Sequence, residues 1–231
     1  MMTLIEEINA RLANTSCSPN ATRVYFKTGV GEYAEHDRFL GVKTGPLRAI
    51  AKDYQHLALT QVQELMESPF NEKRLLALYI LVNHYQKEIV DQEDCYDFYI
   101  KNLPYINNWN LVDASAHWIV GAHLFNRDKG FLEQLANSNI MWERRVAMVA
   151  TWYFIRHNSF EWTIRIAERL RNDKHDLIHK AVGWMLREVG KRNLQVLLTY
   201  LDQHASCMPR TMLRYSIEKL PAEQRQFYMQ K

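Results

Sequence analysis

The sequence predicts an all-α fold, a curved α-solenoid built from stacked antiparallel helix pairs. Three observations lead to this prediction. Apolar residues recur with helical periodicity from about residue 46 onward, whereas alternating strand patterns never persist. Glycine and proline are scarce, at 8 and 6 of 231 residues, as expected of a chain with few turns. The helical segments also return at nearly constant intervals.

The intervals separate the first helices of successive pairs. Breakers such as Ser68-Pro69 and Met208-Pro209 divide the chain into segments, and a second helical segment lies between each two starts, for example 91–101, 159–170 and 194–201. The predicted starts are Pro69, Asn108, Met141, His175 and Pro209, which are 39, 33, 34 and 34 residues apart. One helix pair per 33–39 residues is typical of HEAT-like repeats, whose stacking leaves a concave surface for a partner. An irregular helical bundle with helices of similar length is the alternative.

The N-terminal quarter has a different character. Helical segments are expected at about 4–13 and 19–27, followed by a glycine-containing loop over 28–45. Long loops inside a compact domain tend to be functional. Pro46 is a natural first residue for the next helix. We therefore expect one domain over 1–231, with N-terminal helices and a long loop over 1–45 and helical repeats over 46–231.

Composition limits the functional classes. The formal net charge is +3 and the pI is about 8.7, which is compatible with a polyanionic partner. Three widely spaced cysteines indicate reduced thiols and no disulfide framework. No spanning apolar run and no secretory signal are visible, so we expect a cytoplasmic protein without a membrane partner.

Four residues on three successive repeats could carry chemistry. Trp109 and Asp113 are four residues apart and share a helix face, and Arg145 and Trp184 occupy comparable turns of the next two first helices. An aromatic, a carboxylate, an arginine and a second aromatic would then converge on one patch of the groove. The alternative is structural: both tryptophans belong to the core, and Asp113 and Arg145 form an ion pair between repeats.

Longer motifs resemble those of a known family. The segment Asn108-Trp109-Asn110-Leu111-Val112-Asp113 is similar to an N-W-D-x-V-D motif, and residues 142–147 to a W-x-R-R stretch. Residues 178–188 match a K-A-x-G-W-x-L-R-E block, and residues 25–28 and 39–42 match Y-x-K and F-x-G-V elements. These motifs run in order from about residue 25 to 217. The chain thus resembles the DNA alkylation repair (AlkD-like) glycosylases, which excise cationic alkylated bases from duplex DNA.

The resemblance implies a role for each of the four residues. Asp113 matches the carboxylate that stabilises positive charge on the deoxyribose as the N-glycosidic bond breaks. Trp109 and Trp184 match the aromatics beside the damaged nucleotide's sugar, and Arg145 matches a residue that contacts DNA near the lesion. Asn110 departs from the family pattern, where Asp is frequent, so Asp113 is the only carboxylate of this segment.

The implied substrate is a 3-methyladenine or 7-methylguanine type of purine. Its positive charge makes it a good leaving group that needs no general acid, and a carboxylate stabilises the cationic sugar. No lysine nucleophile is paired with Asp113, which favours a monofunctional glycosylase. The family is thought to act without full base flipping, so we expect no deep base pocket. Contacts to DNA, mostly to phosphates, are expected from Tyr25, Lys27, Lys43, Thr44, Arg48, Arg144, Lys180, Arg187, Arg210 and Arg214.

A histidine pair could indicate a metal site. His175 and His179 mimic a zinc-binding H-E-x-x-H helix, but Asp replaces the glutamate and no third ligand follows, so a cap by Asp173 or Asp176 is favoured. We expect no metal and no cofactor. The alternative function is a non-catalytic repeat protein that binds DNA structure or a protein through the same concave face. We expect a monomer in either case.

Overall fold

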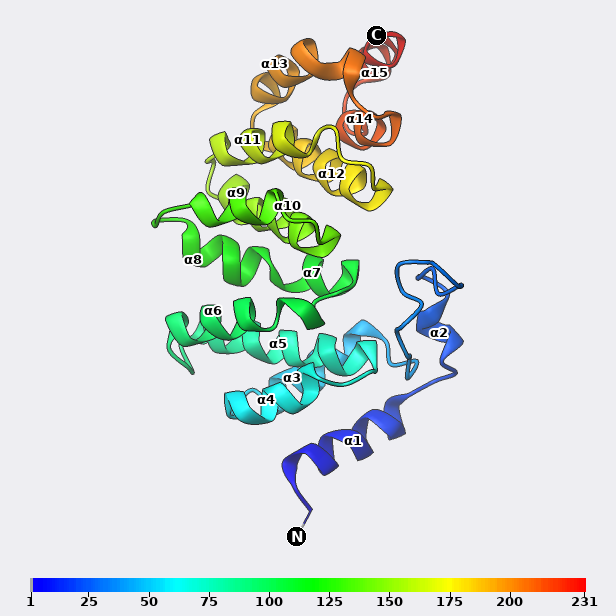
Figure 1. The fold of residues 1–231 in the computed structure, drawn as a ribbon, viewed down its shortest axis with the longest axis vertical. Helices are drawn as coiled ribbons and strands as arrows, with labels where there is room; N and C mark the ends of the chain where they lie inside the picture. Colours follow the sequence, from blue (N-terminus) through cyan, green and yellow to red (C-terminus); the bar gives the residue numbers. More distant parts are fainter. Residues whose placement is uncertain (1) are drawn as a thin grey trace. The chain divides into compact units, whose positions relative to one another are not determined.

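The computed structural model describes residues 2–231, which are helical over most of their length (Figure 1). Within these residues the β-structure is a single isolated bridge between Arg38 and Phe70. The all-α prediction is therefore confirmed. The described chain forms two compact units, the first ending at Ser115 and the second covering Ala116–Lys231. The predicted curvature and concave groove involve both units and stay predictions.

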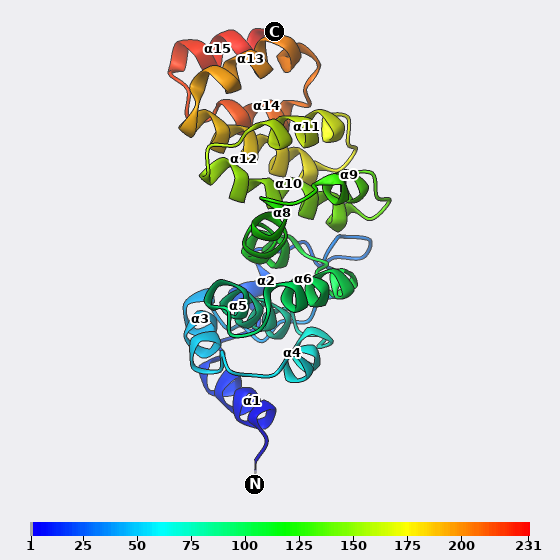
Figure 2. The ribbon, with the colours of Figure 1, turned by 90° about the vertical axis from the view of Figure 1, so that its left-hand side faces the viewer.

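The first unit is organised around one buried helix. Its helices are α1 (Leu4–Thr15), α2 (Asn20–Arg23), α3 (Thr44–Asp53), α4 (Leu59–Met66), α5 (Asn71–Lys87), α6 (Gln92–Lys101), the short 3-10 helix η1 (Leu103–Tyr105) and α7 (Trp109–Ser115). The helices α3, α4, α6 and α7 all pack against α5, which is buried along most of its length (Figure 2).

The first helix of the N-terminal segment begins where it was predicted, whereas the second helix and the start of the third differ from the prediction. Helix α1 begins with a capping box: the Thr3 hydroxyl accepts from the Glu6 amide, and the Glu6 carboxylate accepts from the Thr3 amide. Helix α2 is shorter than the predicted 19–27 segment. Helix α3 begins at Thr44, two residues before Pro46, so proline lies inside the first turn, where its missing amide donor costs nothing.

The second unit stacks helix pairs. Its helices are the π-helical turn η2 (His117–Gly121), α8 (Ala122–Leu124), α9 (Gly130–Ala136), α10 (Met141–Arg156), α11 (Glu161–Leu170), α12 (Asp176–Arg192), α13 (Leu194–His204), the 3-10 helix η3 (Ala205–Cys207), α14 (Arg210–Ile217) and α15 (Ala222–Gln230). Helix α12 packs between α10 and α14, and α11 packs against both α9 and α12. The pairs α9/α10 and α11/α12 form successive layers (Figure 1).

Two glycines bring neighbouring first helices very close together. A Cβ added to Gly121 would lie 2.2 Å from the carbonyl oxygen of Ala150 in α10, and a Cβ added to Gly183 would lie 2.5 Å from that of Met212 in α14. Either methyl group would overlap the backbone of a helix 29 residues further along the chain. Glycine is therefore required at both crossings, and the two crossings use the same offset.

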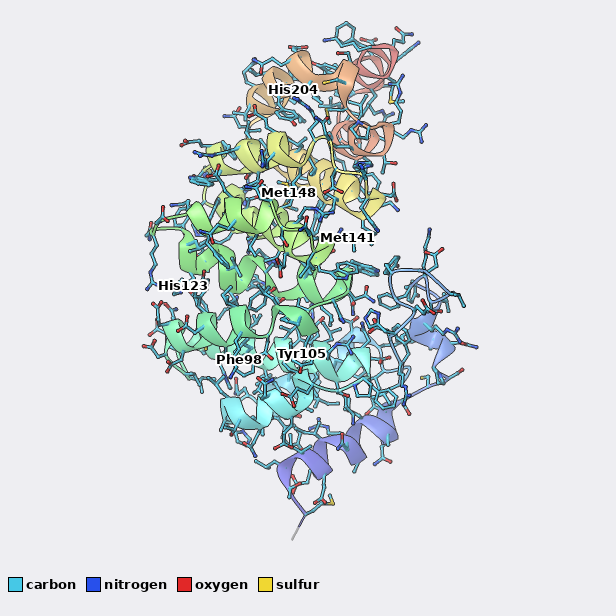
Figure 3. All side chains as sticks on the ribbon, in the orientation of Figure 1. Phe98, Tyr105, His123, Met141, Met148 and His204 are labelled. Atoms are coloured by element: carbon cyan, nitrogen blue, oxygen red, sulfur yellow. The ribbon has the colours of Figure 1, made fainter. Side chains whose placement is uncertain are left out.

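Contacts between successive layers of the second unit recur at a constant sequence separation. Arg145 Nη1 donates to the carbonyl of Leu177 at 2.5 Å, and Arg165 Nε donates to Glu133 Oε1 at 2.6 Å. Both pairs are 32 residues apart. At the end of α13, His204 (labelled in Figure 3) accepts from Arg171, 33 residues away. These separations agree with the repeat interval predicted from the sequence.

The predicted apolar faces form the core. In α10 and α12 the residues Met148 (labelled in Figure 3), Val149, Val182 and Met185 are fully buried. Tyr79 in α5 and Trp152 in α10 are partly exposed. In the described part of the chain, no helix has the length and apolar character needed to cross a membrane.

Candidate functional site

A cavity in the first unit gathers six of the predicted site residues. Its volume is about 600 Å³, and the N-terminal segment, α3, α5 and α7 all contribute to its walls. The predicted site residues that line it are Tyr25, Lys43, Thr44, Arg48, Trp109 and Asp113. No pocket residues were predicted from the sequence, and the structure reveals this cavity. The N-terminal segment lies over α5 and α7 and closes one side of the space, which helical periodicity cannot reveal.

Helix α7 places Asp113 and Trp109 on the same wall. Asn108 begins the helix: its carbonyl accepts from the amides of Leu111 and Val112, both at 3.2 Å, and its Oδ1 accepts from the amide of Trp109 at 2.8 Å. Trp109 and Asp113 are one turn apart, and both are partly exposed. The shared helix face expected from their spacing is present.

Asp113 acts electrostatically on a buried tyrosine and shares the cavity with two cationic side chains. Behind it, Tyr99 is completely buried and its hydroxyl lies 3.1 Å from Ser115 Oγ. Burial raises the pKa of Tyr99, and the negative charge of Asp113 adds to the rise. Lys43 and Arg48 line the same cavity and supply positive charge, and the Arg48 guanidinium lies 5.3 Å from the centre of the Tyr79 ring. A carboxylate thus faces a space bordered by two cations.

Three stacked rings extend from Trp109 into the N-terminal segment. The ring centres of Phe26 and Trp109 are 5.2 Å apart, and those of Phe26 and Phe39 are 4.9 Å apart, each pair inclined by 26°. Phe26 therefore covers one face of Trp109, and Trp109 and Phe26 both line the cavity. Tyr25 and Lys27 of this segment were predicted to contact DNA, whereas Phe26 was not predicted as a site residue.

Asn110, which departs from the family motif, has a structural partner. Its Nδ2 donates to Asn71 Oδ1 at 2.7 Å, and Asn71 Nδ2 donates back at 3.3 Å. The two amides form a reciprocal pair between α5 and α7. An aspartate at position 110 could accept from Asn71 but could not donate to it, so the asparagine fits its neighbour here.

Lys27 and Tyr25 differ in their placement. Lys27 lies outside the cavity lining, is exposed, and its Nζ is 4.0 Å from Glu32 Oε2. Tyr25 lines the cavity although 70% of the residue is exposed.

The second unit holds the other two predicted catalytic residues. Arg145 is 5% exposed, and its hydrogen bond to the carbonyl of Leu177 ties α10 to the first turn of α12. Trp184 is partly exposed and packs edge to face on Trp152, with ring centres 5.0 Å apart. The convergence of Arg145 and Trp184 with Asp113 on one patch stays a prediction.

Four of the five basic residues proposed for DNA binding in the second unit interact with other groups of the protein. Arg144 Nε donates to Asp173 at 2.6 Å. Lys180 forms an ion pair with Asp176 at 2.7 Å and lowers the pKa of that carboxyl. Arg187 pairs with Glu218, and Arg210 donates to the carbonyl of Met229. Arg214 lies in the last turn of α14 and is exposed.

The two histidines of the zinc-like motif serve the start of α12. His175 Nδ1 accepts from the amide of Leu177 at 3.2 Å, and Asp173 accepts from the amide of His175 at 2.8 Å. The predicted aspartate cap is therefore partly wrong, because the imidazole itself caps the helix. Within residues 2–231, no group of three His, Cys, Asp or Glu side chains is arranged to hold a metal ion.

Comparisons with known proteins agree with the motifs. The sequence model of the family described as "DNA alkylation repair enzyme" matches residues 11–220. A solved structure described as "Predicted DNA alkylation repair enzyme from Enterococcus faecalis" is similar with a TM-score of 0.69 and 18% identity, over 90% of this chain and 98% of that one. At this identity the likeness supports the fold alone. No curated protein sequence matched the chain. Since the family model covers nearly the whole chain, the chain belongs to the DNA alkylation repair enzyme family.

Proposed function

We propose that the chain is a monofunctional DNA glycosylase that hydrolyses the N-glycosidic bond of cationic alkylated purines in duplex DNA. The observation that carries this proposal is that Asp113 lines the cavity one helical turn from Trp109, together with Lys43 and Arg48. The family assignment supplies the link to alkylation repair. The site residues supply the chemistry.

The proposed reaction needs little from the protein beyond charge stabilisation. In a 3- or 7-alkylated purine the base carries a positive charge, so the C1′–N bond breaks with its electron pair leaving on the base, which departs neutral. Positive charge then develops on the sugar. Asp113 stabilises this charge, and water adds to C1′ and loses one proton. Removing one such electrostatic group typically lowers a rate by about 100- to 1000-fold.

The aromatic and basic residues have supporting roles. The exposed face of Trp109 can lie against the cationic sugar, because its other face is covered by Phe26. Lys43 and Arg48 line the cavity, and in this proposal they neutralise phosphates beside it. We also propose that Trp184 and Arg145 take part in binding the nucleotide, as the family motif implies.

The test is base release from duplex DNA carrying 7-methylguanine. We expect release by the unmodified chain and a loss of about 100-fold or more in Asp113→Asn. Asp97→Asn, an exposed aspartate of α6, is the matched control and should release base at the unmodified rate. If every form binds the duplex tightly but none releases the base, the protein is a non-catalytic DNA-binding protein and the proposal is wrong.

The monofunctional character has its own test. No lysine nucleophile beside Asp113 was expected from the sequence. Lys43 nevertheless lines the same cavity as Asp113, so its amine could attack an abasic sugar bound there. A lyase would form a Schiff base between an amine and the abasic sugar, and borohydride would trap it. We expect no trapped complex. A complex lost in Lys43→Ala would show that the enzyme is bifunctional.

A further inference from the structure

A buried carboxylate outside the proposed machinery connects the N-terminal segment to α7. Asp37 lies within the long loop predicted over 28–45, and its side chain is 0% exposed. Its Oδ2 accepts from Asn108 Nδ2 at 2.6 Å and from Asn71 Nδ2 at 2.9 Å, and its Oδ1 accepts from Arg74 Nη2. One carboxylate therefore binds the beginning of α5, the beginning of α7 and a buried arginine.

The donors around Asp37 are themselves held in place. Arg74 is 3% exposed, and it also donates to the carbonyl of Ser68 at 2.8 Å and to Asn107 Oδ1 at 3.2 Å. Asn108 is 0% exposed. Burying an ion pair contributes little net stability, because desolvation of both charges offsets their attraction. What such a network does supply is a fixed geometry for the elements that it joins.

The element fixed by Asp37 is the one that carries the proposed catalytic carboxylate. Asn108 is the residue directly before Trp109, and α7 has only seven residues, so a shift at its start moves Asp113 as well. Backbone hydrogen bonds tie the residue after Asp37 to the beginning of α5: the amide of Arg38 donates to the carbonyl of Pro69, and the amide of Asn71 donates to that of Arg38.

A second carboxylate anchors the same segment without reaching α7. Glu72 is 2% exposed and accepts from Thr22 Oγ1 at 2.7 Å and from the amides of Leu40 and Gly41, both at 2.9 Å. The segment is thus held to α5 at Glu72, and Asp37 adds the bonds to Asn108. Asp37 therefore fixes the position of α7, whereas Glu72 holds only the N-terminal segment to α5.

We infer that Asp37 is a positioning residue for Asp113, acting through Asn108 to set the start of α7. The inference rests on the proposed glycosylase function. An error of about 1 Å in the position of a reacting group can cost a rate factor of about 100. Replacing Asp37 by Asn keeps the shape of the side chain, but one oxygen acceptor becomes an amide donor that faces other amide donors. Asp113 is then placed less accurately although none of its own atoms has changed.

The experiment measures Asp37→Asn for single-turnover base release and for affinity toward the same 7-methylguanine duplex. We expect a release rate about 10- to 100-fold lower, with the dissociation constant changed by less than about threefold. Asn108→Ser, which removes the amide donor and leaves the Asp37–Arg74 pair, should lower the rate in the same way. It decides the question if Asp37→Asn fails to fold. Asp53→Asn removes another Asp–Arg pair of the first unit, with Arg11 at 2.5 Å, and should behave like the unmodified chain.

Non-additivity separates positioning from a general structural role. If Asp37 acts through Asp113, then Asp37→Asn lowers the rate of the unmodified chain but causes no further loss in Asp113→Asn. An equal loss in both backgrounds would overturn the inference, and so would an unchanged rate in Asn108→Ser or a loss that only follows the folded fraction. If the unmodified chain releases no base, the proposed function itself has failed.

Discussion

His117 should make the stability of the protein depend on pH in a way that one substitution can isolate. The residue begins the π-helical turn η2 and is 3% exposed. Its ring centre lies 4.7 Å from that of Trp118 and 4.5 Å from that of Trp152, and the Arg156 guanidinium lies 4.5 Å from the Trp118 ring. Among the described residues its Nδ1 has no hydrogen-bond partner. An imidazolium would therefore be buried among rings, beside a cation.

The size of the effect follows from the pKa. Burial first, and then the positive charge of Arg156, lower the pKa of His117 from 6.5 to about 3. Above the unfolded pKa both states are neutral, and His117 adds no pH dependence. As pH falls below it, the unfolded chain binds a proton that the folded chain excludes, so stability is lost. Each pH unit costs about 1.4 kcal/mol, which is about 2 kcal/mol between about pH 7 and about pH 5.

Urea unfolding followed by tryptophan fluorescence tests this prediction. The free energy of unfolding is measured at about pH 7 and about pH 5 for the unmodified chain and for His117→Gln, and the two differences are compared. Other titrating groups act in both proteins, so they cancel. We expect the decrease to be smaller by about 2 kcal/mol in the variant. Parallel decreases in the two proteins would refute the argument, because they would mean that folding does not alter the protonation of His117.

Three further predictions concern packing, thiol chemistry and DNA binding. Gly183→Ala should lower the free energy of unfolding by about 1–3 kcal/mol, because the new methyl group overlaps α14. Gly45→Ala is the control and should not lower it, because nothing lies within 4 Å of the added Cβ. Chemical denaturation measures the free energy of unfolding of both variants. Cys95 is completely buried, and burial raises its pKa to about 12, so a thiol reagent should modify the two exposed cysteines of the folded chain and reach Cys95 only after unfolding. Lys43→Ala should weaken duplex binding for all sequences and reduce the slope of log affinity against log salt by about 1, as measured by a salt titration; an unchanged slope would contradict a phosphate contact.

The helices and their repeat could be predicted from the sequence because local patterns determine them. Helix α10 begins at Met141 as expected, and α12 and α14 begin one residue after His175 and Pro209. Periodic apolar residues and flanking breakers are sufficient to locate such elements. The i, i+4 spacing of Trp109 and Asp113 likewise placed both on one wall of the cavity.

The network behind the cavity could not be predicted in this way. Asp37 binds partners 34, 37 and 71 residues away, and nothing in the local sequence distinguishes it from a surface aspartate. The stacking of Phe26 on Trp109 is equally remote in sequence. The cavity itself depends on how the N-terminal segment folds back over α5 and α7. Such long-range pairings are decided by tertiary packing, so only the three-dimensional structure reveals them.

The two close helix crossings of the second unit indicate that its successive layers are joined by the same kind of interface. Gly121 meets Ala150 and Tyr153, and Gly183 meets Met212 and Tyr215, each glycine facing partners 29 and 32 residues ahead. Because the same interface occurs at two places in the chain, its geometry is set by the local residues and not by its position in the sequence. Insertion of one more helix pair with the same glycine and the same offset would therefore lengthen the unit without new interface chemistry, as in other arrays whose stability comes from nearest neighbours.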